Sequence, residues 1–239
     1  MKINFFATCL CDTVKADVAK QAVLLLEQLG CEVLFPEDQG CCGMPAINSG
    51  YIKSTLPSIK SNIQAFEKND DPIVIAAGSC GAMLKSYPDY FEDDLHWQER
   101  AKRVSDRVYE LTQFIVDYLN VSDVGAKLPG KAVYHPSCSL LRKLHVVEQP
   151  LTLLHSVEGL ELLPFENQNT CCGFGGTFSV KMSEISTEMV KEKVRHITKV
   201  RPDYLIGADI SCLMNIGGRI SREGHSIKVM HIAQVLMSR

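Results

Sequence analysis

Apolar residues along this chain fall into short runs and longer helically spaced stretches, and the two kinds alternate. In the first half, the pattern predicts strands at Ile3–Ala7, Glu32–Phe35 and Pro72–Ala77. The last of these is apolar on both faces, which is typical of a strand buried in a parallel sheet. Val14–Leu29 carries an apolar stripe at helical spacing and is followed by Gly30, a residue favoured just past a helix end. This half therefore predicts alternating strands and helices.

The second half of the chain predicts the same order of elements. Strands are expected at Ala132–His135, Leu160–Leu163 and Tyr204–Gly207, with helices around Pro150–Ser156 and from about Ser183 to Val200. This alternation is typical of α/β proteins, so we expect two repeated, pseudo-symmetric domains, each with a small parallel sheet flanked by helices. In such folds ligands sit at the carboxyl ends of the strands.

Eight of the ten cysteines repeat with nearly one period. The offset from Cys9 to Cys138 is 129 residues, from Cys41 to Cys171 it is 130, and from Cys80 to Cys212 it is 132. This regularity indicates an internal duplication. Turn-forming residues cluster within 120–130, so we predict a first domain at 1–124 and a second at 125–239.

Composition narrows the classes of protein that the chain can be. Of its 239 residues, 46% are apolar and 22% are charged, which is typical of a folded globular protein. The net charge of −3 and the lack of a basic block argue against a nucleic-acid partner. No apolar stretch is long enough for a membrane span, and no export signal is evident, so we expect a cytoplasmic protein. In that compartment ten cysteines favour metal binding or redox chemistry over disulfides.

Each half supplies four thiols in an arrangement that favours an iron–sulfur cluster over a single zinc ion. Structural zinc sites separate their cysteines by about two to four residues, whereas adjacent thiolates can bind different irons of one cluster. The glycine after each adjacent pair, Gly43 or Gly173, gives the backbone freedom to turn both sulfurs toward one object. Four thiolates match the usual ligation of a 4Fe–4S cluster, so two clusters are predicted. The predicted ligands are Cys9, Cys41, Cys42, Cys80, Cys138, Cys171, Cys172 and Cys212.

Five motifs around these cysteines support a family resemblance. They are FFATC at Phe5–Cys9, QGCCGMPA at Gln39–Ala46, YHPSC at Tyr134–Cys138, TCCGFGGTF at Thr170–Phe178 and GADISC at Gly207–Cys212. On these motifs the chain resembles, over essentially its full length, the cysteine-rich (CCG) domain family of heterodisulfide reductase B and glycolate oxidase iron–sulfur subunits. Within that family it is most similar to the lactate utilization protein A group.

The resemblance implies an iron–sulfur electron-transfer subunit of a complex that oxidises L-lactate to pyruvate. It implies two partner subunits, one of them a ferredoxin-like iron–sulfur protein, and no flavin on this chain. The sequence agrees on the flavin, because it has no GxGxxG after a strand and no P-loop. No nucleophilic or proton-abstracting set of residues stands out, so we expect an oxidoreductase subunit that works only with its partners.

One departure from the family pattern leaves other functions open. The fullest family motif ends in C-x-x-C and gives noncubane clusters in heterodisulfide reductase, but here Ala77 and Asp209 replace the first cysteine of that element. An ordinary cubane is therefore favoured, and Asp209 is interpreted as a polar neighbour rather than an oxygen ligand. The alternatives are a catalytic subunit that reduces a disulfide at its cluster and a zinc-stabilised interaction module. Lactate itself rests on the resemblance, since another 2-hydroxy acid would leave the same cysteine pattern.

Three further residues with reactive side chains have simpler interpretations. Cys31 opens an apolar strand without a repeat partner, so it is predicted to be a small buried hydrophobe. Cys11 lies close to the cluster loop and is interpreted as a spare thiol rather than a ligand. For His135, which has no matching histidine in the first half, we favour a structural role over tuning of the second cluster.

Charged residues near the motifs are predicted to have ordinary roles. Glu37 and Glu166 recur before the double cysteines but in different halves, which favours helix capping or loop hydrogen bonding over acid–base catalysis. Lys181, Lys191 and Lys193 lie on a charged helix, and we predict that they form a solvated face.

Overall fold

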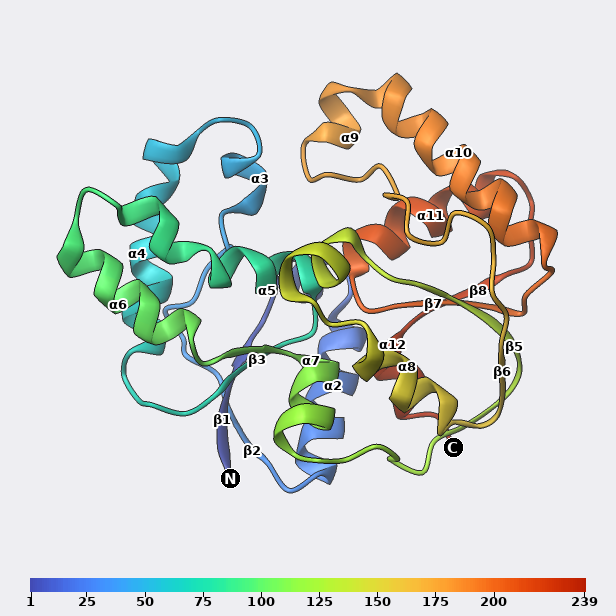
Figure 1. The fold of residues 1–239 in the computed structure, drawn as a ribbon, viewed down its shortest axis with the longest axis horizontal. Helices are drawn as coiled ribbons and strands as arrows, with labels where there is room; N and C mark the ends of the chain where they lie inside the picture. The colour runs from blue at the N-terminus through green and yellow to red at the C-terminus, as the bar shows by residue number, and fades with distance from the viewer. The chain divides into compact units, whose positions relative to one another are not determined.

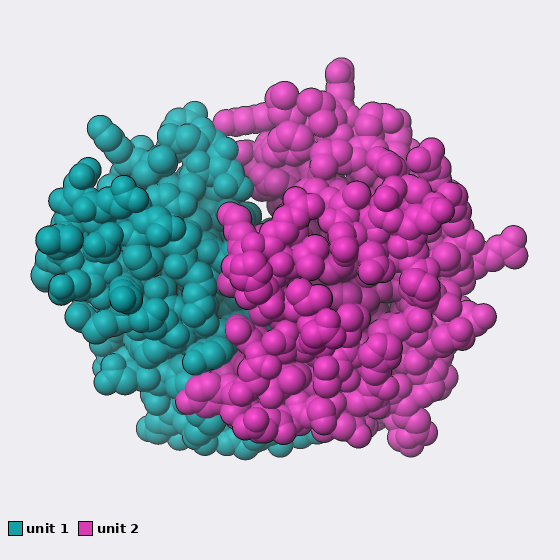
Figure 2. Space-filling view, viewed as in Figure 1, with its two compact units in different colours: residues 1–111 teal, residues 112–239 magenta.

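The computed structural model describes residues 1–239, which divide into two compact units, Met1–Leu111 and Thr112–Arg239 (Figure 1, Figure 2). The elements up to the division are β1 Lys2–Phe6, α1 Cys9–Thr13, α2 Ala16–Gln28, β2 Glu32–Leu34, α3 Met44–Ile47, α4 Ile52–Phe66, β3 Ile73–Ile75, α5 Gly78–Lys85, η1 Tyr87–Phe91, α6 Leu95–Ser105, β4 Val108–Glu110 and α7 Leu111–Gln113. Those that follow are η2 Phe114–Tyr118, β5 Lys127–His135, η3 Leu140–Leu144, α8 Glu148–His155, β6 Glu158–Leu162, α9 Phe178–Lys181, α10 Ser183–Lys199, β7 Tyr204–Gly207, α11 Ile210–Arg222, β8 Lys228–His231 and α12 Ile232–Leu236.

Each unit contains one parallel sheet of four strands, and the two sheets have the same topology. The strand order is β2-β1-β3-β4 in the first unit and β6-β5-β7-β8 in the second. The register also corresponds, because Phe6 at the end of β1 pairs with Ile75, and His135 at the end of β5 pairs with Gly207. The predicted α/β fold with two repeated, pseudo-symmetric domains is therefore confirmed.

Apolar patterning explains why these segments form their elements. All three residues of β3 are buried, as expected for a strand inside a parallel sheet. Helix α2 buries one stripe of apolar side chains, and Gly30 follows it with a φ of +84°. Both elements lie within the predicted ranges Pro72–Ala77 and Val14–Leu29.

Two strands were not predicted from the sequence. β4 and β8 are short, and each forms the last strand at one edge of its sheet. Each has at least one residue that is not buried, so neither gives the continuous apolar run that marks β3.

The hydrophobic core of each unit includes two of its cysteines. In the first unit Cys42 and Cys80 pack with Phe6, Ile59 and Tyr87, among others. In the second unit the core contains Cys172 and Cys212 together with Val133, Phe165 and Val194. These two thiol groups of each unit therefore lie in a packed interior.

The boundary between the two compact units, after Leu111, lies before the domain boundary predicted after residue 124. Segment η2 precedes residue 124 but contacts α8, so it packs within the second unit. The predicted domains, 1–124 and 125–239, describe the sequence repeat and stay a prediction. Among the helices, none combines the length and the apolar character required to cross a membrane.

Candidate functional site

The first thiol site lies where the strands of the first sheet end. Cys9 begins α1 directly after β1, Cys41 and Cys42 lie between β2 and α3, and Cys80 lies on α5 after β3. The Sγ atoms of Cys42 and Cys80 are 3.4 Å apart. Cys41 is hydrogen-bonded through its side chain to Cys42 and Cys9. The four thiols thus form one connected group.

The second thiol site repeats this arrangement in the second unit. Cys138 follows β5, Cys171 and Cys172 lie between β6 and α9, and Cys212 lies on α11 after β7. The side chain of Cys171 is hydrogen-bonded to Cys138 and Cys172, and Cys172 is hydrogen-bonded to Cys212. The structure therefore brings together each predicted set of four thiols, whereas their ligation of a cluster stays a prediction.

The clustered thiols shift one another's pKa values in the same pattern at both sites. At the first site, hydrogen bonds from Cys42 and Cys9 lower the pKa of Cys41. At the second site, the hydrogen bond with Cys138 lowers the pKa of Cys171, and the same bond raises the pKa of Cys138. Each site thus stabilises one thiolate among neighbouring thiols, and thiolate is the form of cysteine that binds metal.

Adjacent cysteines have unequal exposure at both sites. Cys42 and Cys172 are each 2% exposed, whereas Cys41 is exposed and Cys171 is half-buried. All ten cysteines are free thiols. A set of four soft sulfur donors, two of them rooted in the core, fits a Cys₄-ligated iron–sulfur cluster.

The glycine after each double cysteine adopts a backbone conformation that other residues avoid. The φ angle is +93° at Gly43 and +85° at Gly173. A Cβ atom would lie 2.6 Å from Thr55 Cγ2 at the first position and 2.9 Å from the Ser186 carbonyl oxygen at the second. Both the turn and the close helix approach therefore require glycine.

Helices α4 and α10 bury matching faces beside the two sites. The buried positions are Thr55, Ile59, Asn62, Ile63, Ala65 and Phe66 on α4, and Ser186, Val190, Lys193, Val194, His196 and Ile197 on α10. Each buried position on α10 follows its counterpart on α4 by the same number of residues, so Lys193 corresponds to Asn62. This correspondence was missed from the sequence, although a polar residue on the apolar face of each helix was a usable signal.

Asn62 and Lys193 both hold the backbone that leads to a double cysteine. Asn62 Oδ1 accepts a hydrogen bond from the Gly40 N–H at 2.8 Å, and Asn62 Nδ2 donates to the Cys41 carbonyl at 3.0 Å. Lys193 Nζ donates to the carbonyl oxygens of Asn167 at 2.7 Å and Gln168 at 3.0 Å.

The prediction that Lys193 lies on a solvated face is wrong. Lys193 is only 1% exposed, whereas Lys181 is exposed and Lys191 is half-buried. The ammonium group can be buried because the two loop carbonyls accept its hydrogen bonds. Burial lowers the pKa of Lys193 to about 8, against the opposing effect of the nearby thiol groups.

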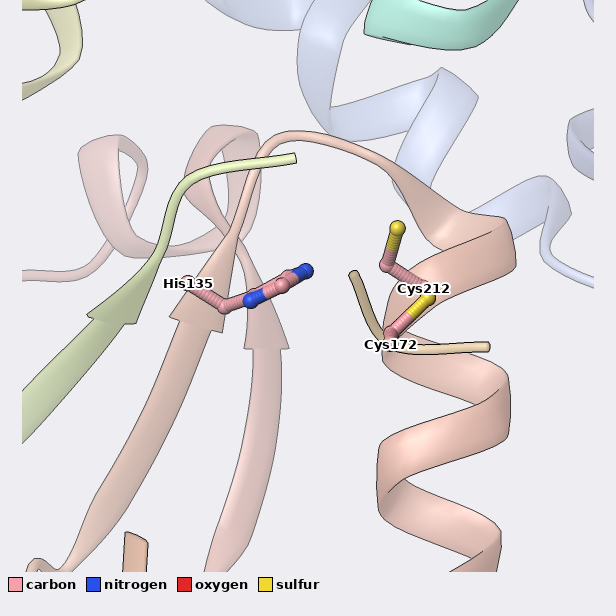
Figure 3. A group of neighbouring side chains, drawn as sticks. All are labelled: His135, Cys172 and Cys212. Carbon is pink, nitrogen blue, oxygen red and sulfur yellow. The ribbon is translucent and has the colours of Figure 1, made fainter. Parts of the chain in front are cut away.

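His135 points its ring toward the second thiol site. The residue is 1% exposed, and neither ring nitrogen has a hydrogen-bond partner. A ring nitrogen lies within 4.8 Å of the sulfurs of Cys172 and Cys212, and Figure 3 shows the ring projecting from the strand end toward them. Burial lowers the pKa of His135 to about 3, so the imidazole is neutral. The ring therefore has unused hydrogen-bonding capacity at the site.

Asp209 caps a helix beside the second site. It is 2% exposed, and its Oδ1 accepts hydrogen bonds from the Ser211 N–H at 3.1 Å and the Ser211 hydroxyl at 2.5 Å. Ala77 occupies the same N-cap position before α5, without a side-chain bond. Capping accounts for a carboxylate at this position.

Glu166 bonds the loop of the second site to α10. Its Oε2 accepts a hydrogen bond from Lys199 Nζ at 2.9 Å and lies 3.0 Å from His196 Nδ1. The loop hydrogen bonding predicted for Glu166 is confirmed, and the Lys199 ammonium group lowers the pKa of this carboxyl. Glu37 is exposed.

The two cysteines outside the repeat are both buried. Cys31 is 6% exposed, as expected for a small hydrophobe, and burial raises its pKa. Cys11 is 1% exposed and lies on α1, two residues after Cys9. Its interpretation as a spare thiol stays a prediction.

Comparison with known sequences assigns both halves of the chain to the same protein family. The cysteine-rich domain family CCG matches residues 3–85 and 132–217, which contain both sets of four thiols. Over 239 residues and the full length of both proteins, the chain is 64% identical to the uncharacterized protein YkgE of Escherichia coli (strain K12). It is 57% identical over the same full length to lactate utilization protein A of Geobacillus sp. (strain WCH70) and of Geobacillus thermodenitrificans (strain NG80-2).

The fold is also similar to that of a solved structure. A hypothetical protein from Helicobacter pylori superposes with a TM-score of 0.65 at 9% sequence identity. The match covers 99% of this chain and 48% of the other, and at this identity it concerns the fold alone.

Proposed function

Because this chain belongs to the cysteine-rich (CCG) domain family, as its doubled motif predicts, we propose that it is an iron–sulfur electron-transfer subunit. The observation that carries the proposal is the pair of four-thiol groups, each gathered where the strands of a parallel sheet end. One 4Fe–4S cluster at each site would supply the means to accept and release single electrons. The ligands would be Cys9, Cys41, Cys42 and Cys80 at the first site, and Cys138, Cys171, Cys172 and Cys212 at the second.

The chain's own residues would fix the position of each cluster and, at the first site, leave one side accessible. Cys42 and Cys80 belong to the packed core, which holds their sulfurs in place. Cys9 and Cys41 are exposed, so the opposite side of the first site faces solvent. That combination suits a relay, since electrons must reach the cluster from a partner at the surface while its ligands stay rigid.

For the biological role, we propose that the chain works in the oxidation of L-lactate to pyruvate with two partner subunits. The support is the full-length identity to relatives named lactate utilization protein A. One partner is proposed to be a ferredoxin-like iron–sulfur protein, and this chain is proposed to bind no flavin. A cytoplasmic location remains a prediction that cell fractionation would test.

A zinc-stabilised interaction module is the competing function. One observation favours it, because His135, Cys172 and Cys212 place their ligand atoms within 4.8 Å of one another and zinc prefers nitrogen and sulfur donors. Phe6 takes the place of this histidine at the first site, so the observation favours zinc at the second site alone.

Metal analysis of protein purified without oxygen separates these functions. We expect about eight irons and eight acid-labile sulfides per chain, with visible absorption that bleaches on reduction. Zinc in place of iron would overturn the electron-transfer proposal. The lactate role has its own test, growth of a deletion strain on lactate as sole carbon source. Normal growth would overturn that role and leave the cluster proposal standing.

A further inference from the structure

The two thiol sites share their cysteines but differ at two buried positions beside them. At the end of the first strand, the first half has Phe6, whose ring stacks on Phe66 with centroids 5.7 Å apart, and the second half has His135. On the neighbouring helix, Asn62 of the first half corresponds to Lys193 of the second. Apolar and neutral groups at the first site are thus replaced by an imidazole and an ammonium group at the second.

The imidazole of His135 faces the second thiol site and has no hydrogen-bond partner within the protein. Both ring nitrogens are buried without a hydrogen-bond partner, and such groups are rare because each one loses its bonds to water. The ring points at the sulfurs of Cys172 and Cys212 (Figure 3). An N–H group in that position can donate a hydrogen bond to cluster or thiolate sulfur.

The ammonium group of Lys193 is buried against the loop that leads to the second double cysteine. Its Nζ donates to two loop carbonyls and lies 5.4 Å from the centre of the Phe165 ring, with the side chain enclosed. It interacts electrostatically with Cys172 and Cys171. A buried cation is costly unless negative charge lies nearby, and a cluster bound by four thiolates supplies that charge.

Two carboxylates oppose this effect, and one of them, the exposed Glu192, interacts electrostatically with the Lys193 ammonium group. Asp209 interacts electrostatically with Cys138, and its counterpart in the first half is the uncharged Ala77. However, Asp209 lies at the N-terminus of α11 and accepts two hydrogen bonds from Ser211, which offset its charge locally. The ammonium group of Lys193 has no such carboxylate partner among its hydrogen bonds.

We propose that His135 and Lys193 are positioning residues that raise the reduction potential of the second cluster. Reduction adds negative charge to a cluster, and a hydrogen bond to its sulfur or a buried cation beside it stabilises the reduced form. The first site lacks both groups, so this stabilisation of the reduced form applies to the second cluster alone. This inference rests on the proposed function, since it requires a cluster at each thiol site.

The test is a redox titration of the full chain followed by electron paramagnetic resonance. Cys41→Ala leaves the second cluster alone to be titrated, and Cys171→Ala leaves the first. In the Cys41→Ala chain, His135→Phe and Lys193→Met should each lower the ratio of reduced to oxidised cluster at fixed potential at least tenfold, a shift of about 59 mV. His135→Gln keeps an N–H donor and Lys193→Arg keeps the charge, so both should retain most of the original potential.

The control and the cluster content distinguish the failure modes. In the Cys171→Ala chain, substitutions at His135 and Lys193 should leave the potential of the first cluster unchanged. Full iron and sulfide content with an unchanged second potential would overturn this inference and leave the proposed function intact. Absence of iron and sulfide from the unsubstituted protein would overturn the proposed function itself. If Lys193→Met does not fold, as judged by circular dichroism, the test is the potential of the second cluster in His135→Phe compared with His135→Gln. Equal potentials in these two variants would overturn the inference.

Discussion

The hydroxyl of Tyr87 donates a hydrogen bond to the carbonyl oxygen of Cys42 across 3.0 Å in the interior of the first unit. The same hydroxyl accepts a hydrogen bond from Asn62 Nδ2, also at 3.0 Å, and Tyr87 is 0% exposed. Asn62 in turn binds the carbonyl of Cys41. A single buried hydroxyl therefore completes the hydrogen bonds that hold the double-cysteine loop against the core.

Tyr87→Phe should lower the free energy of unfolding by about 1–3 kcal/mol, because the buried Cys42 carbonyl loses its donor and the Asn62 amide loses one of its hydrogen bonds. Urea denaturation of the chain prepared without metal measures this. Tyr90→Phe is the matched control, since Tyr90 lies on the same short helix η1 but is only partly buried. Its effect should stay within about 0.5 kcal/mol. Equal losses in the two variants would contradict the role given to the Tyr87 hydroxyl.

Removal of one thiol from either site should halve the iron content. Cys41→Ala and Cys171→Ala each remove a predicted ligand that is not fully buried, so the fold should tolerate them. We expect each variant to bind about four irons per chain, because one of its two sites no longer has the four thiolates that usually bind a 4Fe–4S cluster. Cys31→Ala is the control and should retain the iron of the unsubstituted protein. Equal iron in all three variants would argue against two separate four-thiol sites.

Gly173→Ala should destabilise the second site more than Gly224→Ala does. Both glycines have positive φ, +85° and +75°, so both alanine variants carry the strain of a left-handed backbone, roughly 1–2 kcal/mol. Only at Gly173 would the new Cβ meet another group, the carbonyl oxygen of Ser186 at 2.9 Å. Thermal unfolding measures the difference, and cluster content should fall in the first variant alone. Identical behaviour would show that α10 moves away without cost.

The ion pair between Glu67 and Arg100 should make stability depend on pH in the acid range. Arg100 Nε donates to Glu67 Oε2 at 2.9 Å, and Nη2 binds Oε1. This hydrogen bonding lowers the pKa of Glu67 below its ordinary value of 4.5. The unfolded chain therefore binds more protons at Glu67, and stability from this pair is complete above the unfolded pKa and lost as pH falls through the folded one.

Glu67→Gln should accordingly cost about 0.5–1 kcal/mol at neutral pH, a value typical of a partly exposed pair. Denaturation curves from pH 7 to pH 3 should show the difference from the unsubstituted protein shrinking as the pH falls. Glu92→Gln, at an exposed position, controls for the loss of one charge. A difference that stays constant over this range would mean that Glu67 is not held as a carboxylate by Arg100.

The sequence by itself determined the repeat, the fold class and the identity of the thiols that come together. The nearly constant spacing of the cysteines carries this information, because a duplicated order of strands and helices places corresponding cysteines after corresponding strand ends. The apolar run that became β3 and the helix that became α2 were predictable for the same reason, since burial of one face or of both leaves a period in the sequence.

Only the tertiary structure decided the surroundings of the thiols. Lys193 belongs to a charged helix in the sequence, and its burial depends on the carbonyls of Asn167 and Gln168 folding back to accept its hydrogen bonds. The sequence places His135 at the end of a strand but does not show what its ring contacts. That the ring has no hydrogen-bond partner is visible only in the folded structure. Solvent exposure and hydrogen bonding are set by residues distant in the chain, so no local pattern records them.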